Sequence, residues 1–161
     1  MDEGNLLKKV DLALRVFYDN DSNLLEIDAN ERTVAHRFAL YLEFLFEGRN
    51  VDCEYNRYGD ELGPKTLPGI EHCNSRKETD WIIPDILIHT RKSRDKDNLA
   101  VFEIKVGKVM DLCDERKLSG MTKKDGRFKY DYGLFVCFYE DSYQINLFTN
   151  GDYRELKPII L

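Results

Sequence analysis

The chain has 161 residues, with 24 Lys and Arg against 30 Asp and Glu, and a formal net charge of −6 at pH 7. This length predicts one domain, and a hydrophobic fraction of 42% is too high for a disordered chain. The acidic balance argues against a protein that coats nucleic acid by bulk charge. The longest apolar stretch, Leu134 to Tyr139, is far shorter than the roughly 20 residues of a membrane-spanning helix, so we expect no membrane contact.

The cysteines and the N-terminus bear on the compartment. Cys53, Cys73, Cys113 and Cys137 include no CxxC pair and no zinc-finger spacing, so neither a disulfide framework nor a zinc finger is expected. The first residues lack the apolar core of a secretory signal. These features favour a cytoplasmic location.

Two helices are predicted in the first third of the chain. Apolar residues recur at helical spacing from residue 5 to about residue 18. A second helix is expected from about residue 30 to residue 47, because Asp28 and Glu31 have capping-box spacing and a GRN sequence follows the helix.

The remainder alternates between strand and helix patterns. Strands are predicted over residues 51–57, 81–89 and 98–105, with a long connection over residues 58–80. A third helix is expected over residues 109–118.

A final hairpin is predicted from residues 132–139 and 143–149. The order α, α, β, β, β, α, β, β indicates an α/β or α+β domain with a mixed sheet.

Side-chain alternation along the two central strands places two acids together. If their hairpin is symmetric about its connector, Leu87 lies opposite Val101 and Asp85 lies opposite Glu103. Opposed like charges destabilise a sheet unless something offsets the repulsion. A hard divalent cation such as Mg²⁺ does so, and Lys105 on the same face would lie beside a metal-bound water.

Glu31 is the third candidate acid. At 100° per residue it falls close to the apolar stripe of the second helix, so its carboxylate points toward the sheet. It could complete the capping box, join the metal site, or do both. His72 and Cys73 are weaker candidates for a second metal site, because adjacent residues on an irregular segment rarely provide that geometry.

Pro84 and Asp85, followed by Glu103, Ile104 and Lys105, resemble the PD-(D/E)xK signature of the restriction-endonuclease-like nucleases. The resemblance covers residues 28–149 and implies an αβββαβ core. Residues 1–27 would then be an added N-terminal helix, and residues 150–161 a tail with a C-terminal strand.

The resemblance implies a role for each matching residue. Asp85, Glu103 and the Ile104 carbonyl would hold Mg²⁺ or Mn²⁺, Lys105 would orient or deprotonate the attacking water, and Glu31 would be the additional helical acid. The implied function is a metal-dependent nuclease acting on DNA, alone, as a homodimer or with a partner subunit. The alternative is a non-catalytic domain of the same fold that binds nucleic acid or a protein.

Two basic clusters could contact the phosphates of a nucleic acid. One lies between the two central strands, where solvated surface is the expected role: Arg91, Lys92, Arg94 and Lys96. The other follows the third helix and is nearer the expected site: Lys117, Lys123, Lys124, Arg127 and Lys129.

Overall fold

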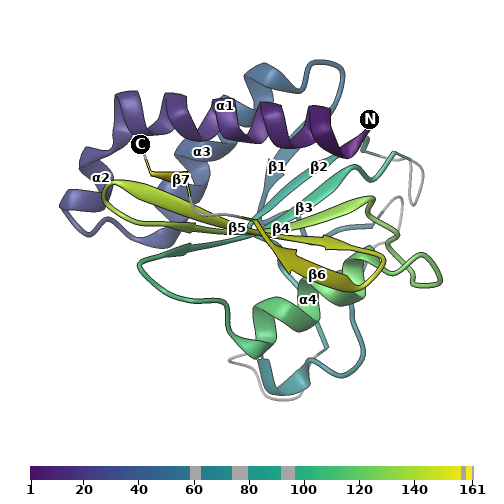
Figure 1. The fold of residues 1–161 in the computed structure, drawn as a ribbon. Coiled ribbons are helices and arrows are strands. Elements are labelled where there is room, and N and C mark those ends of the chain that lie inside the picture. The colour runs from purple at the N-terminus through teal and green to yellow at the C-terminus, as the bar shows by residue number, and fades with distance from the viewer. Residues whose placement is uncertain (59–62, 74–79, 92–96, 157–158, 161) are drawn as a thin grey trace.

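A seven-stranded mixed sheet forms the centre of the protein, with helices on both faces (Figure 1). The computed structural model describes residues 1–58, 63–73, 80–91, 97–156 and 159–160. The strand order is β1-β2-β3-β4-β5-β6, and β7 pairs with β5. The predicted class, an α/β domain with a mixed sheet, is confirmed.

The elements in chain order are α1 (Glu3–Asp21), α2 (Asn23–Glu26), α3 (Glu31–Leu45), β1 (Asn50–Cys53), the short 3-10 helix η1 (Glu71–Cys73), β2 (Ile86–His89), β3 (Ala100–Val106), α4 (Leu112–Thr122), β4 (Tyr132–Phe138), β5 (Ser142–Thr149), β6 (Asp152–Glu155) and β7 (Ile159–Ile160).

Local capping residues decide where the helices begin. The Asp2 side chain accepts a hydrogen bond from the Asn5 backbone N–H at 2.9 Å, so α1 begins earlier than predicted. The predicted capping box at the second long helix is wrong. Asn30 caps α3 by accepting from the Thr33 N–H at 2.9 Å, whereas Asp28 has a left-handed φ of 52° and lies in the preceding turn.

Two strands are shorter than predicted. β1 ends at Cys53 instead of continuing to residue 57, and β2 begins only at Ile86. Pro84 lies between β2 and Trp81, and Trp81 forms only an isolated bridge with Thr66. Proline cannot donate a backbone hydrogen bond to a strand ladder.

The register of the central hairpin is the predicted one. β2 and β3 are antiparallel, with Ile86 opposite Phe102 and Leu87 opposite Val101. β3 and β4 are parallel, and α4 forms the crossover between them. The predicted hairpin of β4 and β5 is also confirmed.

The two faces of the sheet have separate cores. α1 and α3 cover one face and α4 covers the other (Figure 1). Ile86 and Phe102 point into the α1 and α3 core, whereas Leu87 and Val101 point into the α4 core. Strand alternation therefore puts Glu103 on the α4 face. α1, the predicted N-terminal extension, is part of the first core.

No helix within the described ranges combines the length and apolarity that crossing a membrane requires.

Phe138 should contribute strongly to stability. Its buried ring lies 4.9 Å from the ring centroid of Phe17 and 5.5 Å from that of Phe38. We expect Phe138→Ala to lower the free energy of unfolding by about 3–5 kcal/mol in urea denaturation, because it leaves a cavity. Phe44 is 80% exposed, so Phe44→Ala is the control and should change stability by less than about 0.5 kcal/mol. Equal losses would contradict this packing.

Candidate metal centre

Five charged residues meet where β3 passes under α4: Asp85, Glu103, Lys105, Asp114 and Lys117. We call this group the acid–lysine centre. Asp85 directly precedes β2, Glu103 and Lys105 belong to β3, and Asp114 and Lys117 belong to α4. The structure therefore brings together three residues of the predicted signature and adds two residues from the crossover helix.

Glu103 is the most buried member, at 2% exposure. Its Oε2 accepts a hydrogen bond from Lys117 Nζ at 2.7 Å. Its Oε1 is buried without a hydrogen-bond partner among the described residues. One oxygen of this carboxylate is thus paired, and the other has no hydrogen-bond donor in the described part of the chain.

Asp85 is fixed by the neighbouring strand. Its Oδ2 accepts a hydrogen bond from the backbone N–H of Ile104 at 2.7 Å. This hydrogen bond involves the N–H of Ile104 and not its carbonyl group. The role of the Ile104 carbonyl as a metal ligand therefore stays a prediction. The bond holds Asp85 beside the strand that carries Glu103.

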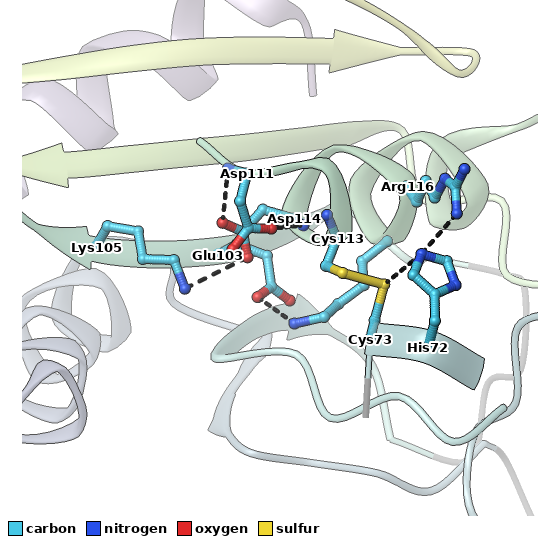
Figure 2. Close-up of a disulfide and its surroundings, with 9 residues drawn as sticks. His72, Cys73, Glu103, Lys105, Asp111, Cys113, Asp114 and Arg116 are labelled. Carbon is cyan, nitrogen blue, oxygen red and sulfur yellow. Dashed lines mark hydrogen bonds and ion pairs between the residues drawn. A yellow bond between two sulfur atoms is a disulfide. The ribbon is translucent and has the colours of Figure 1, made fainter. Parts of the chain in front are cut away.

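Asp114 places Lys105. Asp114 is 2% exposed, and one of its carboxylate oxygens lies 3.5 Å from Lys105 Nζ. The other oxygen accepts from the backbone N–H of Asp111, which closes a capping box at the start of α4 (Figure 2). The helix terminus and the lysine are therefore held by the same side chain.

The pKa values in the centre reflect an excess of buried negative charge. Burial raises the pKa of Glu103 to about 8, against the attraction of Lys117 and with the repulsion of Asp85. Burial also raises the pKa of Asp85 and of Asp114. Burial alone would lower the pKa of Lys105, but the combined charges of Asp114, Glu31, Asp111 and Glu103 outweigh burial and raise that pKa. Additional positive charge would stabilise the three carboxylates.

Asp85 can be reached from the α3 side of the molecule. A pocket of about 230 Å³ is lined by six residues: Arg32, Ala35, His36, Cys53, Glu54 and Asp85. Asp85 is the one residue of the acid–lysine centre that lines this pocket.

Glu31 lies at the edge of the centre and not within it. Its carboxylate pairs with Lys108 Nζ at 3.0 Å, on the segment that follows β3. In the described part of the chain its carboxylate forms no hydrogen bond or ion pair with Asp85 or Glu103, although its charge contributes to raising the pKa of Lys105. Its direct participation in metal binding stays a prediction.

The predicted phosphate-binding cluster separates into different environments. Lys117 points inward to Glu103, so its expected surface role is wrong. Lys124 pairs with Asp131 at 2.8 Å, and Arg127 donates to Thr66 Oγ1 at 3.1 Å.

Lys123 is exposed at the end of α4, and Lys129 has a left-handed φ of 51°. In the other basic cluster, Arg91 pairs with Asp52, while Lys92, Arg94 and Lys96 lie outside the described residues.

The inward direction of Asp114 was detectable in the sequence. Leu118 and Met121 are buried and define the face of α4 that meets the sheet. Asp114 lies four residues before Leu118 and therefore shares this face. Lys117 lies next to this buried face. The helical spacing from Leu118 and Met121 therefore indicates that both charged residues are turned toward the sheet.

A disulfide joins Cys73 of η1 to Cys113 of α4, contrary to the expectation from cysteine spacing (Figure 2). The spacing argument for a reducing compartment does not hold for this pair. His72 lies beside it, and its Nε2 is 2.7 Å from Arg116 Nη1. The three ligand atoms of His72, Cys73 and Cys113 are within 4.8 Å of one another, but the sulfurs are bonded to each other.

Comparisons of the chain with protein-family models, curated proteins and solved structures found no match. The chemistry of the centre is therefore argued from its geometry. Carboxylate oxygens are the ligand type that Mg²⁺ and Mn²⁺ prefer, and one oxygen of Glu103 is buried without a hydrogen-bond partner among the described residues. The ligand atoms of the three carboxylates of the centre do not all lie within 4.8 Å of one another, as those of His72, Cys73 and Cys113 do.

The pH dependence of stability should report on Glu103. Its pKa is about 8 in the folded protein and 4.5 as an ordinary carboxyl, so the folded state holds more protons between these values. The free energy of unfolding should fall as pH rises through this interval, by at most about 1.4 kcal/mol per pH unit. Glu103→Gln should lose this component in denaturation measured with EDTA. Identical pH profiles would contradict the raised pKa.

The disulfide should stabilise the folded chain. It closes a loop between residues separated by 40 positions, for which the chain-entropy argument gives about 2–4 kcal/mol. Cys113→Ser should be less stable by this amount without reductant, and a reducing agent should remove the difference. Cys53 is an exposed free thiol, so Cys53→Ser is the control. A difference that persists in reductant would show that the serine itself disturbs packing.

Proposed function

We propose that the protein is a metal-dependent nuclease that hydrolyses phosphodiester bonds in DNA, with the acid–lysine centre as its active site. The observation that carries the proposal is the buried Glu103 carboxylate, which has one oxygen without a partner beside Asp85 and Lys105. A structural ion pair would not require two further acids whose pKa values are raised by burial.

The order of elements supports the resemblance to the restriction-endonuclease-like nucleases. From α3 to β4 the chain runs α, β, β, β, α, β, omitting the 3-10 turn η1. Asp85 stands at the start of the second strand, and Glu103 and Lys105 lie on the third. This is the placement that the PD-(D/E)xK signature implies.

The residues of the centre divide into three roles. Asp85 and Glu103 would hold the cation, and Lys105 Nζ would orient the attacking water or accept its proton. Asp114 positions Lys105, and Lys117 compensates part of the Glu103 charge. A bound Mg²⁺ or Mn²⁺ would polarise the phosphoryl oxygen and lower the pKa of its water. Glu31 and the Ile104 carbonyl are proposed as additional ligands.

The rival function is a non-catalytic domain that binds nucleic acid or protein through the same fold. The overall acidic charge favours this rival, because strong electrostatic attraction to DNA is absent at the level of the whole chain. The two functions differ in whether product forms when a divalent cation is present.

Cleavage assays with plasmid, single-stranded DNA and RNA in Mg²⁺, Mn²⁺ or EDTA separate these functions. We expect metal-dependent product and a loss of at least about 100-fold in Lys105→Ala, because a positioned proton acceptor typically supplies that factor. Lys8 is exposed on α1, so Lys8→Ala is the control and should cleave normally. Wild-type cleavage by Lys105→Ala would reject the role of this lysine.

Metal binding can be measured without cleavage. Mn²⁺ should raise the melting temperature of the wild-type protein, because a ligand that binds only the folded state stabilises it. The increase should be smaller or absent in Asp85→Asn and Glu103→Gln and unchanged in Lys8→Ala. Metal binding without any cleavage would favour the non-catalytic alternative.

A further inference from the structure

A basic pocket lies on the side of α4 that is turned away from the acid–lysine centre. It has a volume of about 580 Å³ and is lined by residues 66–70, by α4 and by the turn at residues 126–127. Its charged side chains are Arg116, Lys123 and Arg127, with Glu115 as the single acid. In a chain of net charge −6, this is a local reversal of sign.

Both guanidinium groups contact neighbouring side chains. Arg127 Nη1 donates to Thr66 Oγ1 at 3.1 Å, and its guanidinium lies 5.4 Å from the ring centroid of Tyr58. Arg116 Nη1 lies 2.7 Å from His72 Nε2. Cations that are ordered before a ligand arrives lose less conformational entropy on binding.

Lys123 and its neighbour Lys124 differ in their environment. Lys124 Nζ pairs with Asp131 at 2.8 Å. Lys123 lines the pocket and has no carboxylate partner within the ranges that the structure describes. The charge of Lys123 is therefore available to an anionic ligand.

The walls of the pocket are closely packed. A Cβ atom on Gly120 would lie only 2.6 Å from a terminal methyl group of Leu67, so residues 66–70 rest directly on the helix backbone. The Cys73–Cys113 disulfide fastens the chain that follows to the start of α4 (Figure 2). The pocket is thus bounded by two segments that are joined covalently.

An aromatic residue lies directly opposite Thr66, one of the residues that line the pocket. Trp81, the only tryptophan of the chain, pairs with Thr66 in an antiparallel bridge and is 41% exposed. Directly opposed residues project to the same face of a bridge. A partly exposed aromatic ring next to fixed cations is the combination with which proteins bind unpaired nucleic acid, by stacking bases and pairing phosphates.

We propose that the basic pocket binds a phosphate group of a single-stranded nucleic acid, with a neighbouring base stacked on Trp81. The pocket faces away from Asp114 and Lys117, so the phosphate held there is an anchor and not the scissile group. This inference extends the proposed function but does not depend on cleavage.

The test is binding of a labelled single-stranded DNA oligonucleotide in EDTA, followed by anisotropy and by the fluorescence of Trp81. The wild-type protein should bind with quenching of Trp81. Lys123→Glu should weaken binding by about ten-fold or more and lower the slope of log affinity against log salt by about 1. Lys8→Glu introduces the same charge change on α1, outside the pocket, and should weaken binding by less than about two-fold.

Four results would overturn the proposal: equal weakening by the two variants, binding without quenching of Trp81, binding of tripolyphosphate without binding of the oligonucleotide, or binding of an acidic peptide in its place. Thermal melts establish that each variant is folded. If Lys123→Glu is not folded, Lys123→Gln replaces it with the same expected direction.

The outcome is separable from that of the proposed nuclease. Lys8→Ala should bind the oligonucleotide as the wild type does, because Lys8 is exposed on α1 and lines neither the basic pocket nor the acid–lysine centre. If the wild-type protein cleaves DNA but Lys123→Glu does not weaken oligonucleotide binding more than the control variant does, the proposed role of the basic pocket is rejected and the nuclease proposal stands. If Lys123→Glu specifically weakens oligonucleotide binding but the wild-type protein cleaves no DNA, the nuclease proposal is rejected and the role of the pocket stands.

Discussion

The burial of Glu103 is the constraint on which the candidate metal centre depends. A carboxylate at 2% exposure in the middle of β3 is costly unless it is paired. Lys117 pairs with one oxygen and thereby fixes the position of α4 against the sheet. The second oxygen has no partner among the described residues. The fold thus keeps a half-paired buried carboxyl group next to Asp85 and Lys105, and Asp85 also lines the pocket beside α3.

The sequence was sufficient to predict the register of the central hairpin, but the predicted cross-strand pair of Asp85 and Glu103 lies outside the ladder, because β2 begins at Ile86. Strand alternation has a period of two, and the assumption of symmetry about the connector gave the observed pairing of Leu87 with Val101. The contacts of Lys117 and Asp114 with β3 could not be obtained in this way. They depend on how α4 is rotated over the sheet, which the packing of Leu118 determines only after the helix boundaries are known.

The remaining differences come from local competition and from long-range pairing. Asp28 and Asn30 both precede α3, and both residue types are good N-caps. Asn30 is the N-cap because its backbone is extended, whereas Asp28 has a left-handed φ in the preceding turn. Cys73 and Cys113 are far apart in the sequence, and connectivity cannot be deduced from spacing alone. The disulfide also shows that a cysteine pattern without close pairs does not exclude a covalent bridge.

The single parallel pair in the sheet has a consequence for folding. Four of the five charged residues of the acid–lysine centre lie on β3 and α4, which follow each other in the chain. The fifth, Asp85, directly precedes β2, the hairpin partner of β3. Bringing these residues together therefore closes only short loops, which costs little conformational entropy. β4 then places Phe135 beside Glu103. A nascent chain that has emerged only as far as α4 already contains all five residues of the acid–lysine centre, and dehydration of these charges is completed when the later strands arrive.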